Sequence, residues 1–289
     1  MTFVKILAPL TGGGRDHAVL ASAFAAAAPF HAHVAALFVR PDATEAVPFY
    51  GESVSANVMQ EIADASKKAA DEAIRMARAS LQAAAKEAGA VVQETPAILD
   101  RPTASFTEVL GNFADRVTLA ARLSDLVVFG ALKEGERPGL TEAFEATLLE
   151  TGRPVLLSAQ AASTSFCKKK VSVAWNDSVA SAHAVTAALP FLKCAESVEI
   201  LSVTRGKDEP IGCSEVKAYL KLHGIEAADV KVDGGNRGIA DVLLEAASKG
   251  GAGLLVAGGY GHNRLREMFF AGVTRQVVSH ADLPVFLVH

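Results

Sequence analysis

The sequence predicts an α/β protein built from two tandem domains, each a five-stranded, mostly parallel sheet with helices on both faces. Three observations predict this. The order strand, loop, helix, strand occurs twice, from Asp125 to Ser158 and again from Gly253 to Val288. Strand-like runs alternate with helical patterns along the chain, the order that parallel sheets require. The runs SDLVVFG and GAGLLVAGG are apolar throughout, as expected of strands buried on both faces.

Each half repeats the same order of elements, β-α-β-α-β-α-β-α-β. The first half begins with the apolar strand VKILAPL and the second with VSVAW, and both continue through a small polar turn into an alanine-rich helix. The first copy is longer because an amphipathic helical pattern runs from Val54 to a natural stop at Gly89. In the second half the expected strands are Val171–Trp175, Val198–Thr204, Asp229–Asp233, Gly253–Gly258 and Val285–Val288.

The boundary between the halves is predicted in the small and polar stretch Ser158–Lys170, which gives domains of residues 1–160 and 161–289. The last strand of each half, PVLLS and PVFLVH, is short and apolar. An apolar strand makes a poor free edge of a sheet. We therefore expect the halves to pack as an intrachain pseudo-dimer through these strands, and a homodimer of the whole chain remains open.

Composition excludes several classes of protein. The 289 residues are 50% hydrophobic and 21% charged, as in ordinary globular proteins, and a net charge of -4 gives no general attraction to nucleic acid or to an anionic membrane. The three cysteines are far apart and the histidines are scattered, so neither a disulfide framework nor a metal site is predicted. Without a recognisable secretory signal or membrane span, the predicted location is the cytoplasm.

Several motifs resemble the universal stress protein family in its tandem form, over essentially the whole chain. They are the turns at Thr11 and Asn176, the loop AGGYGH, the helix start AGVTR and the closing strand LPVFLV. The resemblance implies a fold like that of the adenine nucleotide alpha hydrolases and a regulatory role in the stress response. It also implies ATP or a related adenine nucleotide as ligand, with no enzymatic activity beyond slow ATP hydrolysis at most.

Nucleotide-binding members of that family carry the pattern Gly, two residues, Gly, nine residues, then Gly followed by Ser or Thr. Gly258 and Gly261 satisfy its first part, whereas the second part falls on Ala271 and Gly272 and departs from the pattern. Bare backbone and a nearby hydroxyl at a helix start are what bind phosphate. The anion site is therefore expected in the second half. The first half, with Lys133 in place of Gly261, is expected to be a structural partner.

The resemblance also implies which residues surround the nucleotide. Asn176 stands where nucleotide-binding relatives usually have aspartate; an amide brings no charge for magnesium, so Mg²⁺ remains open. Trp175 is expected either to stack on the base or to pack in the core. The implied set is Ala174, Trp175, Asn176, Val203, Ala257, Gly258, Gly261, His262, Arg264, Ala271, Gly272, Val273 and Thr274.

Two other functions remain open. A scaffold that binds protein partners and no nucleotide is favoured by the methyl group of Ala271. An enzyme of the ATP pyrophosphatase type would use the loop Gly12–Asp16, which follows a strand and opens a helix. Gly12 and His17 replace the two hydroxyl residues of that loop in such enzymes, and no catalytic constellation is apparent elsewhere in the sequence.

Overall fold

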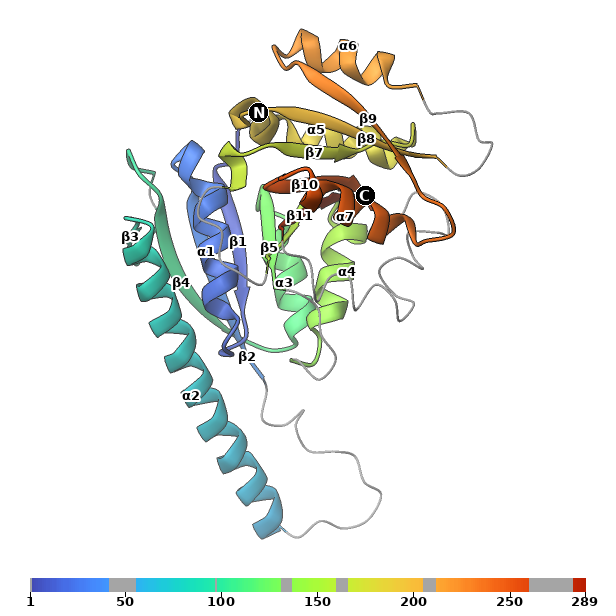
Figure 1. Ribbon diagram of the computed structural model, residues 1–289. Coiled ribbons are helices and arrows are strands. Elements are labelled where there is room, and N and C mark those ends of the chain that lie inside the picture. Colours follow the sequence, from blue (N-terminus) through green and yellow to red (C-terminus); the bar gives the residue numbers. More distant parts are fainter. Residues whose placement is uncertain are drawn as a thin grey trace.

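A single continuous sheet of eleven strands runs through the computed structural model, with helices on both of its faces (Figure 1). Every neighbouring pair of strands is parallel except the pair at the centre, where the two halves of the chain meet. The predicted fold class is therefore confirmed. The structure describes residues 2–41, 56–96, 98–130, 137–159, 166–204, 212–259 and 283–289.

The first half contains the five predicted strands and one short additional strand, Val91–Val92, at the outer edge of the sheet. This strand was missed because only two residues form it. The elements are β1 (Lys5–Leu10), α1 (Asp16–Ala27), η1 (Ala28–Phe30), β2 (His33–Arg40), α2 (Ala56–Glu87), β3 (Val91–Val92), β4 (Thr103–Leu110), α3 (Phe113–Ala121), β5 (Leu126–Phe129), α4 (Leu140–Glu150) and β6 (Val155–Leu157).

The second half follows the predicted order closely. Two of its strands, Val198–Thr204 and Val285–Val288, have the predicted boundaries, and the third begins two residues earlier than expected, at Ala227. The elements are η2 (Phe166–Lys168), β7 (Val171–Ala174), α5 (Val179–Cys194), β8 (Val198–Thr204), α6 (Ser214–Leu222), β9 (Ala227–Asp233), α7 (Ile239–Lys249), β10 (Leu254–Gly258) and β11 (Val285–Val288).

Both halves have the same strand order when it is read outward from the central β6–β11 pair. The sheet runs β3-β4-β2-β1-β5-β6-β11-β10-β7-β8-β9, so each half places its first strand in the middle and its last strand at the centre of the molecule. There β6 and β11 pair antiparallel, with Leu157 opposite Val285 and Val155 opposite Leu287. The predicted pairing of the final strands is thus present, and it removes two apolar edges from solvent.

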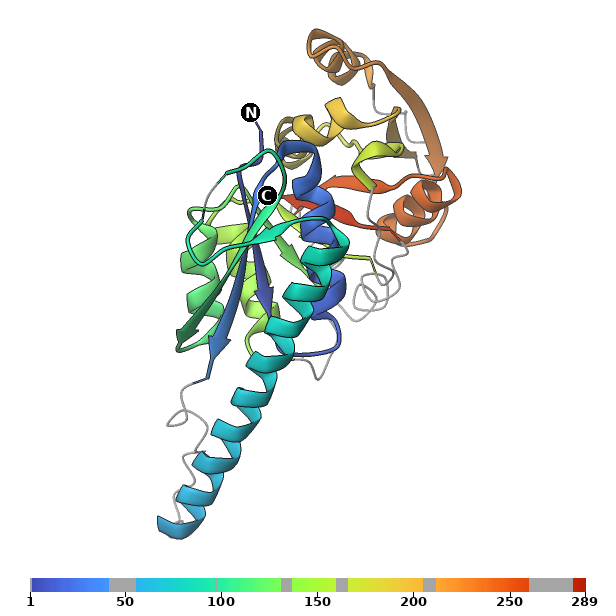
Figure 2. The ribbon, with the colours of Figure 1, turned by 90° about the vertical axis from the view of Figure 1, so that its left-hand side faces the viewer.

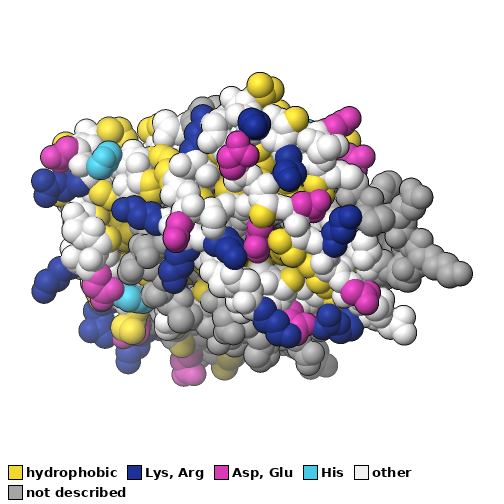
Figure 3. Space-filling model, turned by 45° about the horizontal axis from the view of Figure 1, so that its top comes forward, with side chains coloured by type: hydrophobic (Ala, Val, Ile, Leu, Met, Phe, Trp, Pro, Cys, Tyr) yellow, Lys and Arg dark blue, Asp and Glu magenta, His cyan; other side chains and the backbone are white. Residues whose placement is uncertain are grey.

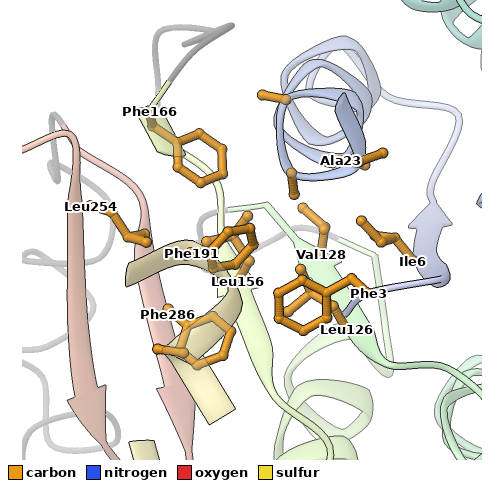
Figure 4. Packing of buried hydrophobic residues seen from close by; sticks show 14 of the residues in the cluster. Phe3, Ile6, Ala23, Leu126, Val128, Leu156, Phe166, Phe191, Leu254 and Phe286 are labelled. Atoms are coloured by element: carbon orange, nitrogen blue, oxygen red, sulfur yellow. The ribbon is translucent and has the colours of Figure 1, made fainter. Parts of the chain in front are cut away.

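Hydrophobic side chains fill both faces of the sheet and cross between the halves. Helices α1, α2, α5 and α6 cover one face, and α3, α4 and α7 cover the other. Phe3 precedes β1, Phe191 lies on α5 and Phe286 on β11. The Phe3 and Phe191 ring centroids are 4.7 Å apart, and those of Phe191 and Phe286 are 5.8 Å apart (Figure 4). Because these aromatic rings pack as pairs, the two halves share one core.

Helix α2 is the long amphipathic helix that the sequence predicts, and much of it projects beyond the body of the protein (Figure 2). Its fully buried side chains, Ala77, Leu81, Ala84 and Ala85, all lie in its C-terminal half. The helix ends before Gly89, whose φ of +64° suits a residue without a side chain. Among the described helices, none combines the length and apolarity needed to cross a membrane.

The surface carries charges of both signs. Lysine and arginine side chains alternate with aspartate and glutamate over the face that includes α5 and α6 (Figure 3). Such mixing agrees with the small net charge of -4. It gives this face no field of one sign that would attract a polyanion.

Candidate functional site

The candidate site in the second half lies at the carboxyl edge of the sheet. Strand β7 is flanked by β8 and β10, and all three are parallel. Their carboxyl ends therefore lie at one edge of the sheet, which is where ligands bind in open α/β sheets. This is the crevice that the sequence predicts for the turns after Trp175 and Ala257.

Neutral groups hold the turn after β7. The Ser178 hydroxyl donates to Oδ1 of Asn176 at 2.6 Å, and the Ser178 and Ser181 side chains each accept the other's backbone N–H, at 3.2 and 3.1 Å. This reciprocal pair is a capping box that begins α5. Asp177 sits in the turn with a φ of +58°. The backbone N–H groups of Asn176 and Asp177 have no hydrogen-bond partner among the described residues.

The predicted nucleotide-contacting residues that the structure describes divide between the two faces of the sheet. Ala174, Val203 and Ala257 pack with the cluster under α7, whereas Trp175 packs with the opposite cluster, under α5 and α6. Strand alternation causes this division, because neighbouring residues point to opposite faces. Trp175 Nε1 is buried and has no hydrogen-bond partner in the described part of the chain, and Asn176 is exposed.

Gly258 has a packing reason to lack a side chain. A Cβ atom there would lie 2.4 Å from the carbonyl carbon of Ala180 and 2.6 Å from the nitrogen of Ser181, in the first turn of α5. The next N–H, of Gly259, donates to the carbonyl oxygen of Val288 within the sheet. The sequence attributes the bare backbone at Gly258 to contact with phosphate, whereas close approach of a helix already requires it.

The remaining members of the predicted set lie outside the described residues. They are Gly261, His262, Arg264, Ala271, Gly272, Val273 and Thr274.

The equivalent turn of the first half is held by a carboxylate. In the alignment that pairs Ile6 with Val171, Asp16 falls on Ser181. The Asp16 side chain accepts three hydrogen bonds: from the Thr11 N–H at 2.9 Å, the Thr11 hydroxyl at 3.0 Å and the Gly12 N–H at 2.8 Å. An internal anion therefore occupies the donors with which this turn would bind an external one.

The Asp16 carboxylate is buried and lies near the charge of Arg137. Burial raises the pKa of Asp16, an effect opposed by the hydrogen bonds from Thr11 and Gly12 and by the charge of Arg137. The Arg137 guanidinium donates to the carbonyl of Val39 and lies over the ring of Phe113, 4.6 Å from its centroid. Burial in turn lowers the pKa of Arg137.

Helix α2 closes the same turn from outside. Gly12 has a φ of +78°, and a Cβ atom there would lie 2.5 Å from Cβ of Ala73 on α2. The loop Gly12–Asp16 is therefore filled by its own carboxylate and packed under a helix, which disfavours a pyrophosphate-binding enzyme loop. Sequence reasoning placed Asp16 at the end of an enzyme-like loop and missed its role in closing the turn, although an acidic residue in the first turn of a helix after a glycine-rich loop is a recognisable capping signal.

No cluster of three or more histidine, cysteine, aspartate or glutamate side chains suited to a metal occurs among the residues that the structure describes. Neither Cys194 nor Cys213 forms a disulfide with another described residue. Burial raises the pKa of each thiol, which disfavours the reactive thiolate form.

Residues 168–289 match the model of the universal stress protein family. The second half of the chain belongs to this family. No curated protein matches the sequence. The matched residues include all of the strands and helices of the second half from β7 to β11. The first half repeats the strand order of this domain, read outward from the central β6–β11 pair.

Solved structures of universal stress proteins resemble the whole chain in fold. One from Archaeoglobus fulgidus DSM 4304 has a TM-score of 0.59 at 13% sequence identity, covering 98% of this chain and 95% of that one. A protein from Pseudomonas aeruginosa UCBPP-PA14 assigned to the same family has a TM-score of 0.51 at 14% identity, covering 99% of this chain and 93% of that one. At these identities the likeness concerns the fold alone, and that fold is the tandem universal stress protein fold.

Proposed function

We propose that the protein is a regulatory tandem universal stress protein of the cytoplasm that holds ATP or a related adenine nucleotide in its second half. One observation carries the proposal. The N–H groups of Thr11 and Gly12 bind Asp16, whereas the equivalent N–H groups of Asn176 and Asp177 bind no described residue. Two backbone donors at a strand-to-helix turn are suited to an anionic or polar ligand.

The described residues fit an adenine nucleotide at this edge. The half-buried Ala174 and Val203, which pack with the same cluster as the buried Ala257, offer an apolar surface for a base, and the exposed amide of Asn176 offers hydrogen bonds to a base or ribose. Gly258 and Gly261 match the first part of the family's phosphate-binding pattern, and Gly272 and Thr274 follow Ala271, where the second part departs from it. Asp177 brings an exposed carboxylate to the same turn, so Mg²⁺ dependence belongs to the test. Any bound nucleotide would bias conformation or partner choice rather than undergo fast turnover.

A scaffold that binds no nucleotide is the second candidate. The specific observation in its favour is that packing against α5 already accounts for Gly258, so this glycine does not require a ligand. The methyl group of Ala271, at a position where the family motif has glycine, favours the same candidate.

Thermal unfolding with and without nucleotide separates the two candidates. We expect ATP to raise the Tm of the wild type, since a ligand at 100 times its Kd stabilises a protein by about 2.7 kcal/mol. Gly261→Glu should abolish the rise, and the matched variant Lys133→Glu in the first half should retain it. The series is run with ATP and AMP, each with and without Mg²⁺, alongside equilibrium dialysis with labelled ATP.

If ATP shifts no Tm and dialysis detects none bound, the nucleotide proposal is wrong and the scaffold stands. If both glutamate variants lose the response equally, the asymmetry between the halves is wrong. Release of pyrophosphate from ATP would support the enzyme instead.

A further inference from the structure

A second surface, remote from the nucleotide turn in sequence and built by the first half, has the features of a binding site. An open groove with a volume of about 560 Å³ lies between α3 and α4, on the face of the sheet opposite α1 and α2. Figure 1 shows these two helices side by side at the molecular surface. The groove is lined by Ala114, Asp115, Thr118, Leu119, Arg122, Glu142, Glu145, Ala146, Leu149 and Glu150.

Large apolar side chains are exposed along this groove. Leu119 on α3 is 54% exposed and Leu149 on α4 is 41% exposed, and Ala114 and Ala146 lie between the helices. Leu123, which follows the end of α3 and lies outside the lining of the groove, is 81% exposed. Leucines grouped in this way on a surface are characteristic of sites that bind another apolar surface.

The rim of the groove is acidic. Asp115, Glu142, Glu145 and Glu150 line it together with a single cation, Arg122. Carboxylates on both sides of an apolar floor attract cationic groups and repel phosphate. This excludes nucleic acid and anionic lipid as occupants and favours a positively charged one.

The floor of the groove contains an unsatisfied hydroxyl. Thr118 is only 7% exposed, and its Oγ1 has no hydrogen-bond partner among the described residues. Leaving a buried hydroxyl unpaired is costly. Because Oγ1 itself is covered by neighbouring atoms, this hydroxyl gives no evidence for an occupant, and the case for one rests on the apolar lining and the acidic rim of the groove.

We propose that the groove between α3 and α4 binds an amphipathic helix rich in lysine or arginine from a partner protein. A helix laid in a groove presents apolar residues at positions i, i+3, i+4 and i+7, which would contact Leu119 and Leu149. Its cationic side chains would flank the apolar stripe and meet Glu142 and Glu150. This interaction is separate from nucleotide binding and does not depend on it.

Fluorescence anisotropy with the full chain tests the proposal. The probe is a fluorescein-labelled peptide of leucine and lysine at helical spacing, about four turns long. We expect saturable binding in physiological salt. The double variant Glu142→Lys/Glu150→Lys should weaken binding by about tenfold or more, because close charge pairs across an interface couple strongly. Leu119→Ser should also weaken it.

Matched controls make the outcome decisive. Glu196→Lys/Glu215→Lys changes two exposed glutamates of the second half by the same charge and should leave the affinity unchanged. A peptide with glutamate in place of lysine should not bind. Circular dichroism establishes that each variant is folded. Absence of binding, equal weakening by both double variants, or binding of the glutamate peptide would overturn the proposal.

Discussion

The turns after β1 and β7 have similar backbones and opposite chemistry. Gly12 and Asp177 occupy equivalent positions, and both have positive φ, +78° and +58°. In the first turn the carboxylate of Asp16 accepts both exposed N–H groups. In the second turn the equivalent residue is Ser181, whose hydroxyl accepts the N–H of Ser178 at 3.1 Å and donates to the Ser178 carbonyl at 2.8 Å. The side chain at this position therefore differs in charge between the two turns, and only the carboxylate accepts the N–H groups that follow its strand.

The difference extends to what surrounds each turn. The first turn is covered by Ala73 of α2 and lies within the field of Arg137. The counterpart of α2 in the second half is the short helix α6, which covers less of the sheet. A buried carboxylate is tolerated in the first half because hydrogen bonds and a nearby cation compensate it. The N–H donors of the first turn are thus engaged by the chain itself, whereas those of Asn176 and Asp177 have no partner among the described residues.

The largest expected effect is on stability, and it compares the glycines at the carboxyl ends of β10 and β5, Gly258 and Gly130. Gly258→Ala should lower the free energy of unfolding by about 3 kcal/mol, since its Cβ would meet backbone atoms of α5 that have little room to move. Gly130→Ala, at the equivalent position, should cost less than about 1 kcal/mol, since its Cβ would meet only Cγ2 of Val19, at 3.4 Å. Urea unfolding followed by circular dichroism measures both. Equal losses would contradict the comparison.

The next prediction exchanges the side chains of Asp16 and Ser181, the equivalent residues of the two turns. Asp16→Ser should destabilise the protein by about 2 kcal/mol, because the Thr11 and Gly12 donors lose a charged acceptor. Ser181→Asp should abolish any nucleotide-induced rise in Tm, because its carboxylate would reach the donors of Asn176 and Asp177. Thermal unfolding with and without ATP measures both changes. A Ser181→Asp protein that still responds to ATP would show that this turn does not contact the ligand.

A smaller effect concerns backbone strain. Asp177 adopts a left-handed conformation that costs a residue with a side chain about 1 kcal/mol. Asp177→Gly should therefore raise the free energy of unfolding, by up to about 1 kcal/mol, because the relief of strain exceeds the added chain entropy of glycine. The control is Asp177→Ala, which removes the same charge but keeps a Cβ atom in the left-handed backbone and so relieves no strain. Destabilisation by Asp177→Gly would show that its side chain holds the turn.

The strands could be predicted from sequence because their signal is local. The apolar runs at Val198–Thr204 and Val285–Val288 set the boundaries that the structure has. The edge strand β9 was predicted too short because its side chains are mostly exposed and its apolar pattern is weak. The pairing of β6 with β11 could also be inferred, since an apolar terminal strand must be covered.

The candidate site was less predictable because it depends on distant segments. The spacing of Gly258 and Gly261 suggested phosphate contact, yet the requirement at Gly258 comes from α5, far away in sequence. Asp16 is close in sequence to the donors that it binds, but its burial depends on α2 and on Arg137. The glycine motif therefore predicts a site at this edge of the sheet, whereas the hydrogen bonds and packing of each turn depend on the tertiary structure.

The smallest expected effect compares the opposite, amino edges of the two half-sheets. There His33 on β2 is buried, with Nδ1 2.8 Å from the Thr103 hydroxyl and Nε2 2.9 Å from the Ser105 hydroxyl. In the second half, the carboxylate of Glu199 on β8 instead accepts a hydrogen bond from the Ser172 hydroxyl, at 2.6 Å. Burial, aided by the charge of Lys5, lowers the pKa of His33 from its ordinary value of 6.5. The folded protein therefore favours the neutral imidazole.

This lowered pKa makes stability depend on pH in one direction. Below about pH 6.5 the unfolded chain takes up a proton that the folded chain resists, so the free energy of unfolding should fall with pH until His33 is protonated in the folded state as well. His33→Gln, which keeps a neutral polar side chain, should lose less stability between pH 7.5 and pH 5. Urea unfolding at the two pH values measures the difference. Equal losses in both proteins would mean that burial of His33 does not couple folding to protonation, because the amide of the variant has no proton to gain in this range.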